Sequence, residues 1–219
     1  MIDLHCHILP GIDDGSKDMN ESMELILSAQ RLGCKKICCT THYRVGRYEN
    51  KNYDGALKKL RDQLKIDKID IELLEGNELF LDLEGLSALK EKKVKTLNKS
   101  DYLLVEAIPG MTKVALEKSL ELIINLGYKP VLAHVERYPF IKVKTLYELK
   151  KLGVVIQVNL KSLRHKKKIY KWIELGLVDI LSSDVHDRKY RNYELGDIIK
   201  EIDNKLGRKT RERLLMGNP

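Results

Sequence analysis

The first residues of the chain carry a pattern that could bind metal ions. His5 and His7 follow a short apolar stretch, Ile2 to Leu4, that is typical of a β-strand. Side chains two residues apart in a strand point to the same face. The two imidazoles would therefore lie side by side, as two ligands of one ion must. A Pro-Gly turn would bring Asp13 or Asp14 back towards them.

More histidines and carboxylates stand where other apolar strands are expected to end. Such strands are expected over residues 36–40, 69–74, 101–105, 130–133 and 178–182. The polar residues near their ends are His42, Glu78, Glu106, His134, Asp184 and His186. Because the carboxyl ends of parallel barrel strands share one face, we expect these side chains to gather there.

This set of side chains favours a cluster of metal ions that acts on phosphate esters. Five histidines with several carboxylates exceed the four or so protein ligands that one ion takes. A mixed nitrogen and oxygen set suits Mn²⁺, Zn²⁺ or Fe²⁺ rather than Ca²⁺. Clustered ions lower the pKa of a bound water and hold both the attacking and the leaving oxygen. Arginines that could hold the phosphate oxygens are Arg44, Arg47, Arg137, Arg188 and Arg191.

Helical and strand patterns alternate along the whole chain, which predicts an α/β fold of parallel strands joined by helices. Residues 2–4 and 154–158 complete a set of seven strands, all apolar on both faces as buried strands are. Helices are expected over 17–32, 53–64, 112–126, 140–152, 161–175 and 194–206, the first capped by Ser16. Four of them end at a glycine, namely Gly33, Gly127, Gly153 and Gly176. No linker interrupts this pattern, so we expect one domain over residues 1–219.

Composition limits the classes of binding partner and the cell compartment that we expect for this protein. The net charge of +8 suits an anionic partner, but the densest basic run, Arg164 to Lys168, is expected to be a solvated helix start rather than a nucleic-acid patch. No signal peptide and no apolar run long enough to cross a membrane is evident. The four cysteines are clustered early and do not form a disulfide framework. We therefore expect a cytoplasmic protein, not inserted in a membrane, with reduced and mostly buried thiols.

A cysteine-dependent phosphatase is the competing interpretation. Cys38 and Arg44 have the C-x5-R spacing of such enzymes and follow a strand. The loop between them contains no glycine, although a backbone cradle for phosphate usually requires one. Cys38 is therefore expected to belong to the core.

The motifs together resemble the PHP (polymerase and histidinol phosphatase) superfamily. The resemblance is carried by His5-x-His7, PGIDDG at 10–15, Thr41-His42, Gly76-Asn77-Glu78, HVERY at 134–138 and SDVH at 183–186. The HVERY stretch and RYEN at 47–50 are most similar to the CpsB/YwqE-type tyrosine-protein phosphatases of Gram-positive capsule and exopolysaccharide loci. The resemblance covers essentially the whole chain and implies a distorted seven-stranded, TIM-like (β/α) barrel.

The resemblance also implies roles for individual residues. His5, His7, Glu78 and Asp184 would hold one ion; Glu78 would bridge to a second, shared with Glu106 and His134; Asp14, His42 and His186 would hold a third. Arg137 and Arg191 would stabilise the phosphate, and Arg44, Arg47 and Tyr48 are expected to bind substrate. The implied metal is manganese, two or three ions, with Fe²⁺, Zn²⁺ or Co²⁺ as other fits. The implied substrate is the phosphorylated tyrosine-rich tail of a bacterial tyrosine kinase that controls polysaccharide assembly.

Other functions stay open at this stage. They are a small-molecule phosphatase such as one acting on histidinol phosphate, a metal-dependent nuclease, and a catalytically idle metal-binding module that docks a kinase. The RYEN run argues weakly against the first two, and the full ligand set argues against the third. The chain ends at Asn218-Pro219, about ten residues before the family pattern does, which leaves its oligomeric state open.

Overall fold

Seven parallel strands form the centre of the molecule. The computed structural model describes residues 1–216, so the expectation about Asn218-Pro219 lies outside the described residues. The strands pair in sequence order, from β1 to β7. They are β1 (Ile2–Cys6), β2 (Lys36–Tyr43), β3 (Glu72–Phe80), β4 (Tyr102–Glu106), β5 (Lys129–Leu132), β6 (Val155–Asn159) and β7 (Ile180–Ser182).

The sheet closes on itself through the first and last strands. A parallel bridge joins Cys6 to Val185, just after β7. Two backbone hydrogen bonds accompany it, from Asp184 N to His5 O at 2.8 Å and from His7 N to Val185 O at 2.9 Å. The expected seven-stranded, TIM-like barrel is therefore confirmed, and the closure joins the two segments that carry His5, His7 and Asp184.

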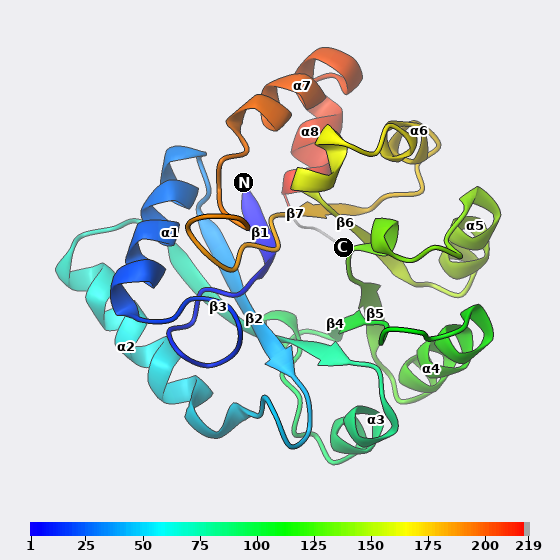
Figure 1. Ribbon diagram of the computed structural model, residues 1–219, viewed down its shortest axis with the longest axis horizontal. Helices are drawn as coiled ribbons and strands as arrows, with labels where there is room; N and C mark the ends of the chain where they lie inside the picture. The colour runs from blue at the N-terminus through cyan, green and yellow to red at the C-terminus, as the bar shows by residue number, and fades with distance from the viewer. Residues whose placement is uncertain (217–219) are drawn as a thin grey trace.

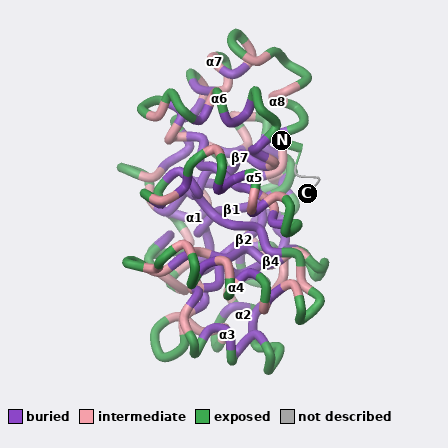
Figure 2. The backbone as a smooth tube through the Cα atoms, turned by 90° about the vertical axis from the view of Figure 1, so that its right-hand side faces the viewer, coloured by how far each residue is buried: buried purple, intermediate pink, exposed green. Residues whose placement is uncertain are grey.

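Helices surround the barrel on its outside (Figure 1). They are α1 (Met19–Arg31), α2 (Tyr53–Ile66), α3 (Leu83–Lys90), α4 (Lys113–Asn125), α5 (Val143–Lys151), α6 (Lys168–Glu174), α7 (Gly196–Leu206) and α8 (Arg208–Leu215). Most of them bury an apolar stripe, as α4 does with Leu116, Leu120 and Ile123. Buried residues fill the middle of the molecule and exposed ones its outer turns (Figure 2). None of the helices within residues 1–216 is long and apolar enough to cross a bilayer.

A β-bulge in β1 turns the two histidines into the barrel. Asp3 pairs with Ile37 and Cys6 with Cys39, so β1 has one residue more than β2 over this stretch. Leu4 packs in the interior cluster with Cys38, Leu74, Leu104, Val131 and Ile180, whereas Cys6 packs in the outer core. The extra residue reverses the alternation of faces, and His5 can therefore lie inside the barrel although Leu4 before it does so too.

Several elements differ from the sequence-based expectation. Strand β3 was expected to end at Leu74, but it continues to Phe80, because Gly76 is not a turn residue. A Cβ on Gly76 would lie 2.9 Å from the Cys38 Sγ, so glycine serves close packing inside the barrel.

The helix boundaries also need correction. The helix expected over 161–175 is a 3₁₀ turn (Leu160–Arg164) followed by the short α6. Helix α1 is capped by Asp18, whose side chain accepts from Glu21 N, rather than by Ser16. Helix α8 was not expected at all, since its single apolar pair, Leu214-Leu215, gives little periodicity.

Candidate metal centre

Nine side chains from around the barrel converge at the carboxyl ends of its strands. The structure brings together four groups of potential metal ligands, with atoms inside each group within 4.8 Å of one another. They are His7-Asp14-His42-His186, His5-His7-Asp184, His5-Glu78-His134 and His42-Glu78-Glu106. All nine expected ligands occur in these groups, and no other residue within 1–216 does.

Glu78 on β3 lies at the centre of the cluster. Its Oε2 atom is 3.2 Å from His5 Nε2, 3.3 Å from His7 Nε2 and 3.1 Å from His42 Nδ1. Its Oε1 atom lies 2.9 Å from His134 Nε2. The two oxygens of one buried carboxylate thus face four imidazoles, which is the arrangement that a bridging ligand requires.

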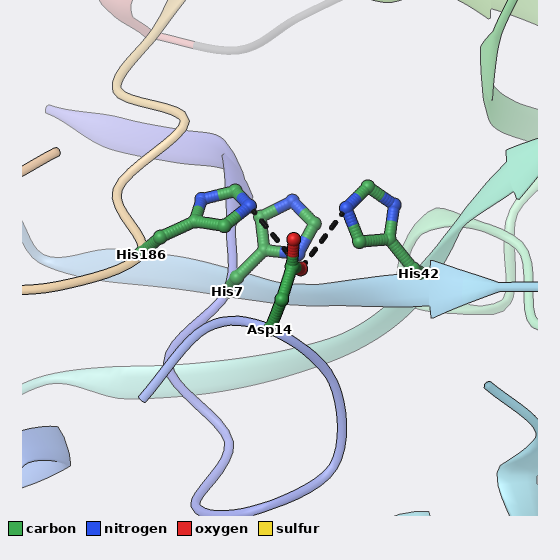
Figure 3. A group of neighbouring side chains, drawn as sticks. All are labelled: His7, Asp14, His42 and His186. Atoms are coloured by element: carbon green, nitrogen blue, oxygen red, sulfur yellow. Dashed lines mark ion pairs between the residues drawn. The ribbon is translucent and has the colours of Figure 1, made fainter. Parts of the chain in front are cut away.

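The loop after β1 supplies the exposed side of the cluster. Asp14 lies between His42 and His186, with Oδ1 at 3.3 and 3.7 Å from their Nε2 atoms (Figure 3). The loop folds back so tightly that a Cβ on Gly15 would lie 2.1 Å from the His7 carbonyl oxygen. Glycine is therefore required here for Asp14 to reach the histidines.

Asp13 has a different role from Asp14. Its Oδ2 accepts from His7 Nδ1 at 2.7 Å and from the His42 backbone N–H at 2.8 Å. A proton held on Nδ1 leaves the Nε2 lone pair of His7 free to face the cluster. Asp13 therefore orients the expected ligand His7, and Asp14 is the carboxylate that joins the group of potential ligands.

The grouping differs in detail from the implied assignment. Glu106 lies nearer to His42 Nδ1, at 3.0 Å, than to His134 Nε2, at 3.8 Å. His7 belongs to the Asp14 group as well as to the His5 group. The contact of His134 with Glu78 agrees with the implied assignment, and His134 Nδ1 also contacts the Tyr138 hydroxyl at 3.3 Å.

The imidazoles of the cluster have different pKa shifts because their electrostatic surroundings differ. Burial works against a charge on His5, but Glu78 and Asp184 outweigh it and raise its pKa to about 9. The pKa of His42 is likewise raised by Glu78, Asp14 and Glu106, against the effect of burial. Burial, together with His7, instead lowers the pKa of His186 to about 2. Neighbouring imidazoles therefore differ in the protons they hold.

Buried polar atoms that lack hydrogen bonds also indicate that the cluster fits divalent cations. Glu78 Oε2, Asp184 Oδ1 and His186 Nε2 are buried and form no hydrogen bond of good geometry within residues 1–216, although each has an ion-pair contact within 4 Å. Buried polar atoms are normally satisfied, and these three point into one cluster of nitrogen and oxygen donors. A divalent metal takes such donors and compensates the buried carboxylates.

Both expected catalytic arginines contact the same carboxylate. Arg137 Nη2 lies 2.6 Å from Asp184 Oδ2, and Arg191 Nη2 lies 2.6 Å from Asp184 Oδ1. Their side chains stay 42% and 35% exposed, so each guanidinium keeps donors free. Arg188, another candidate, instead pairs with Glu24 at 2.7 Å, away from the cluster.

Sequence reasoning missed the polar support beneath the ligands. Gln157 Oε1 accepts from the His134 backbone N–H at 2.7 Å and lies 3.2 Å from His5 Nδ1. Its amide donates to Asn159, which donates to Asp184 Oδ2 at 2.6 Å. The available signal was the pair of amides two residues apart in the otherwise apolar strand β6.

His134 and Asp184 have left-handed backbone conformations, with φ of 35° and 53°. Each lies two residues after the end of a strand, and neither is glycine. Such backbones cost about 1–3 kcal/mol for an ordinary residue and cluster at functional sites. The same conformation also occurs at Lys68, Lys92, Asn98 and Lys99, outside the cluster, so the backbone alone does not identify the site.

The expected substrate residues flank the cluster on one side. Arg44, Arg47 and Tyr48 line a cavity of about 190 Å³ together with Asp14, His42, Phe80 and Glu106. The Tyr48 ring stacks on His42 at 5.9 Å, and the Arg44 guanidinium lies 4.4 Å from the Phe80 ring centroid. Cations and aromatic rings thus adjoin the metal ligands.

The thiolate alternative does not fit this geometry. All four cysteines are free and buried, as expected. Burial raises the pKa of Cys38 well above its usual range, and its thiol donates to the Glu75 carbonyl at 3.1 Å. A buried neutral thiol inside the barrel is a poor nucleophile, and Cys38 belongs to the core.

Comparison with known proteins identifies a family for the whole chain. A family model described as capsular polysaccharide synthesis, CpsB/CapC, matches residues 1–219. The chain is 30% identical to the tyrosine-protein phosphatase CpsB of Streptococcus pneumoniae over 234 residues, covering 100% of this chain and 96% of that one. It is 32% identical to the tyrosine-protein phosphatase YwqE of Bacillus subtilis, covering 94% and 85%.

Solved structures of related proteins are consistent with the same family. One from work on YwqE from Bacillus subtilis and CpsB from Streptococcus pneumoniae, described as unique metal-dependent tyrosine phosphatases, superposes with a TM-score of 0.87 at 29% identity, covering 96% of this chain and 90% of that one. Histidinol phosphate phosphatase from Lactococcus lactis, at a TM-score of 0.56 and 15% identity, shares the fold. This chain belongs to the CpsB/CapC family of capsular polysaccharide synthesis proteins.

Proposed function

We propose that this protein is a metal-dependent protein-tyrosine phosphatase that acts in the regulation of capsule or exopolysaccharide synthesis. The observation that carries the proposal is the cluster of nine ligands around Glu78 beside two partly exposed arginines. Relatives of similar length that bear the name tyrosine-protein phosphatase support it. The whole chain, residues 1–219, is proposed to form one catalytic domain.

We assign the nine residues to two or three ions, with manganese as the proposed metal and iron, zinc or cobalt as alternatives. His5, His7 and Asp184 would hold one ion, and Asp14, His42 and His186 another. Glu78 would bridge to a site that includes His134 and Glu106. The mixed donor set and the three buried atoms that lack a hydrogen bond of good geometry support this assignment.

The chain's own residues would position and neutralise the phosphate. Bound ions of this kind supply the positive charge that activates a water molecule and offsets charge on phosphate oxygens. Arg137 and Arg191 each contact Asp184 through one guanidinium nitrogen. Their remaining N–H groups would donate to non-bridging phosphate oxygens. Asp13 and Gln157 keep His7 and His5 in orientation throughout.

The substrate side of the proposal concerns a phosphotyrosine in a protein. Arg44, Arg47 and Tyr48 line the cavity next to His42, and we assign them to binding the tyrosyl ring and its flanking chain. The proposed partner is the tyrosine-rich tail of a bacterial tyrosine kinase, and neither nucleic acid nor a membrane is a proposed partner. Free, buried cysteines suit the reducing cytoplasm, which is the proposed compartment.

The test uses metal-stripped protein assayed before and after Mn²⁺ is added. The substrates are p-nitrophenyl phosphate, a phosphotyrosine peptide and the matching phosphoserine peptide. We expect metal-dependent turnover that favours the phosphotyrosine peptide and survives thiol alkylation. Turnover of none of the three with Mn²⁺, or abolition of turnover by alkylation alone, would contradict the proposal.

A further inference from the structure

A second cavity opens beside the metal centre, on the side of Asp184 that faces away from His42. Its volume is about 250 Å³, and the residues that matter below are Arg137, Lys161, His165, Lys166, Asp184 and Arg191. Lys161 and Ser162 belong to the 3₁₀ turn after β6, and Arg191 belongs to the loop after β7. The basic run at residues 164–168, which was expected to be a solvated helix start, therefore borders the proposed active site through His165 and Lys166.

The cavity is positively charged and its lysines have no acidic partner. Lys161 Nζ donates to the Tyr190 carbonyl, and Lys166 Nζ donates to the Glu136 carbonyl at 2.8 Å. Neither lysine forms an ion pair with a carboxylate within residues 1–216, whereas the nearby Arg164 does so with Asp197. Four fixed cations line the cavity against one lining carboxylate, Asp184, and the Glu136 carboxylate is buried behind it.

Asp184 connects this cavity to the metal centre. Its Oδ1 faces His5 and His7, while its Oδ2 accepts from Asn159 and Arg137 on the cavity side. One side chain thus separates the two spaces. An extended peptide advances about 3.5 Å per residue, so a residue a few positions from the reacting phosphotyrosine would reach the cavity.

We propose that this cavity, with Lys161 and Lys166 as its specificity residues, binds the side-chain carboxylate of an acidic residue that flanks the phosphotyrosine. The inference rests on the proposed function and adds a sequence preference to it. Lysine ammonium groups act as point charges and lack the planar fork of a guanidinium. They therefore select for negative charge beside the phosphotyrosine and do not require a bidentate partner. Arg137 and Arg191 stay committed to the reacting phosphate.

The test compares two phosphotyrosine peptides that differ only in having Glu or Gln at the flanking positions. The measured quantity is the ratio of kcat/KM for the Glu peptide over that for the Gln peptide. In the wild-type protein we expect a ratio above one that falls with added salt. Lys161→Met/Lys166→Met should reduce that ratio about threefold to tenfold, through KM, as two half-exposed ion pairs would.

Matched variants separate charge at this cavity from charge in general. Lys167→Met/Lys171→Met removes the same charge from exposed neighbours outside the cavity, and it should keep the wild-type ratio. Lys161→Arg/Lys166→Arg should retain most of it. An unchanged ratio in Lys161→Met/Lys166→Met, or an equal loss in the control, would overturn the subsite.

A binding measurement distinguishes failure of the subsite from failure of the proposed function. Fluorescence anisotropy with the same two peptides, carrying a non-hydrolysable phosphonate, reports on the cavity whether or not hydrolysis occurs. A preference for the Glu peptide that depends on Lys161 and Lys166 supports the subsite. Hydrolysis of both peptides with no such preference in binding overturns the subsite and leaves the phosphatase assignment intact.

Discussion

Glu78 connects more of the candidate centre than any other side chain described above. Burial alone would raise its pKa, yet the facing imidazoles of His5 and His42 hold that pKa well below its usual range. A charged carboxylate in this position can serve two ions at once, since its oxygens face different histidines. Removing its charge should therefore weaken more than one site.

The prediction concerns Glu78→Gln. The glutamine amide has the size of the glutamate side chain but lacks its charged metal-ligating oxygen. We therefore expect the amount of bound metal to fall and kcat/KM to drop by at least about 100-fold. Metal content by mass spectrometry and turnover of p-nitrophenyl phosphate check this, with circular dichroism to confirm folding. The control is Glu75→Gln on the same strand, where the side chain has only a 3.9 Å contact with Lys95; near-normal metal content in Glu78→Gln would contradict the role.

At the scale of elements, strand ends and the loops that follow them decide what the site can do. The gathering of eight of the nine expected ligands was predictable from sequence because parallel strands in a barrel bring their ends to one face, whereas Asp14 in the loop after β1 was expected only from the family resemblance. The pairing of Glu106 with His42 rather than His134 was not, since it depends on how neighbouring strands are staggered. The bulge in β1 was also not predictable from sequence, because the residue pattern IDLHC is compatible with a strand that contains a bulge and with one that does not.

Close packing in the loop after β1 gives a prediction at this scale. Gly15→Ala would force a Cβ against the His7 carbonyl and Cβ, at 2.1 and 2.6 Å. We expect it to destabilise the protein by about 1–3 kcal/mol and to displace Asp14. Denaturant unfolding and metal content measure the two effects. Gly55→Ala in α2 is the control, since nothing lies within 4 Å of its added Cβ, and equal behaviour of the two variants would refute the prediction.

The metal centre also matters for the whole molecule. Its ligands come from β2 and β3 and from the ends of β1, β4, β5 and β7, so bound ions would cross-link most of the barrel wall. A ligand that binds only the folded state raises stability by about 2.7 kcal/mol when present at 100 times its dissociation constant. Stability should therefore depend on metal supply.

This dependence should vary with pH. In the stripped protein His5, with a pKa of about 9, and His42, with a raised pKa, hold protons at neutral pH. An incoming cation must displace these protons, so its apparent affinity falls as the pH falls. We expect Mn²⁺ to raise the melting temperature strongly near pH 8, less near pH 6, and to release protons in weakly buffered solution. A Mn²⁺ effect that grows on acidification would contradict this reading of the cluster.

At His134 and Asp184 the side chain that suits the candidate centre is not the one that suits the left-handed backbone. At these two positions glycine would suit the main chain better than the residue that is there. A lineage that had ceased to use the centre could replace either residue with glycine and gain stability in doing so. The chain therefore keeps, two residues after β5 and two residues after β7, side chains of the candidate centre on backbones that glycine would adopt with less strain.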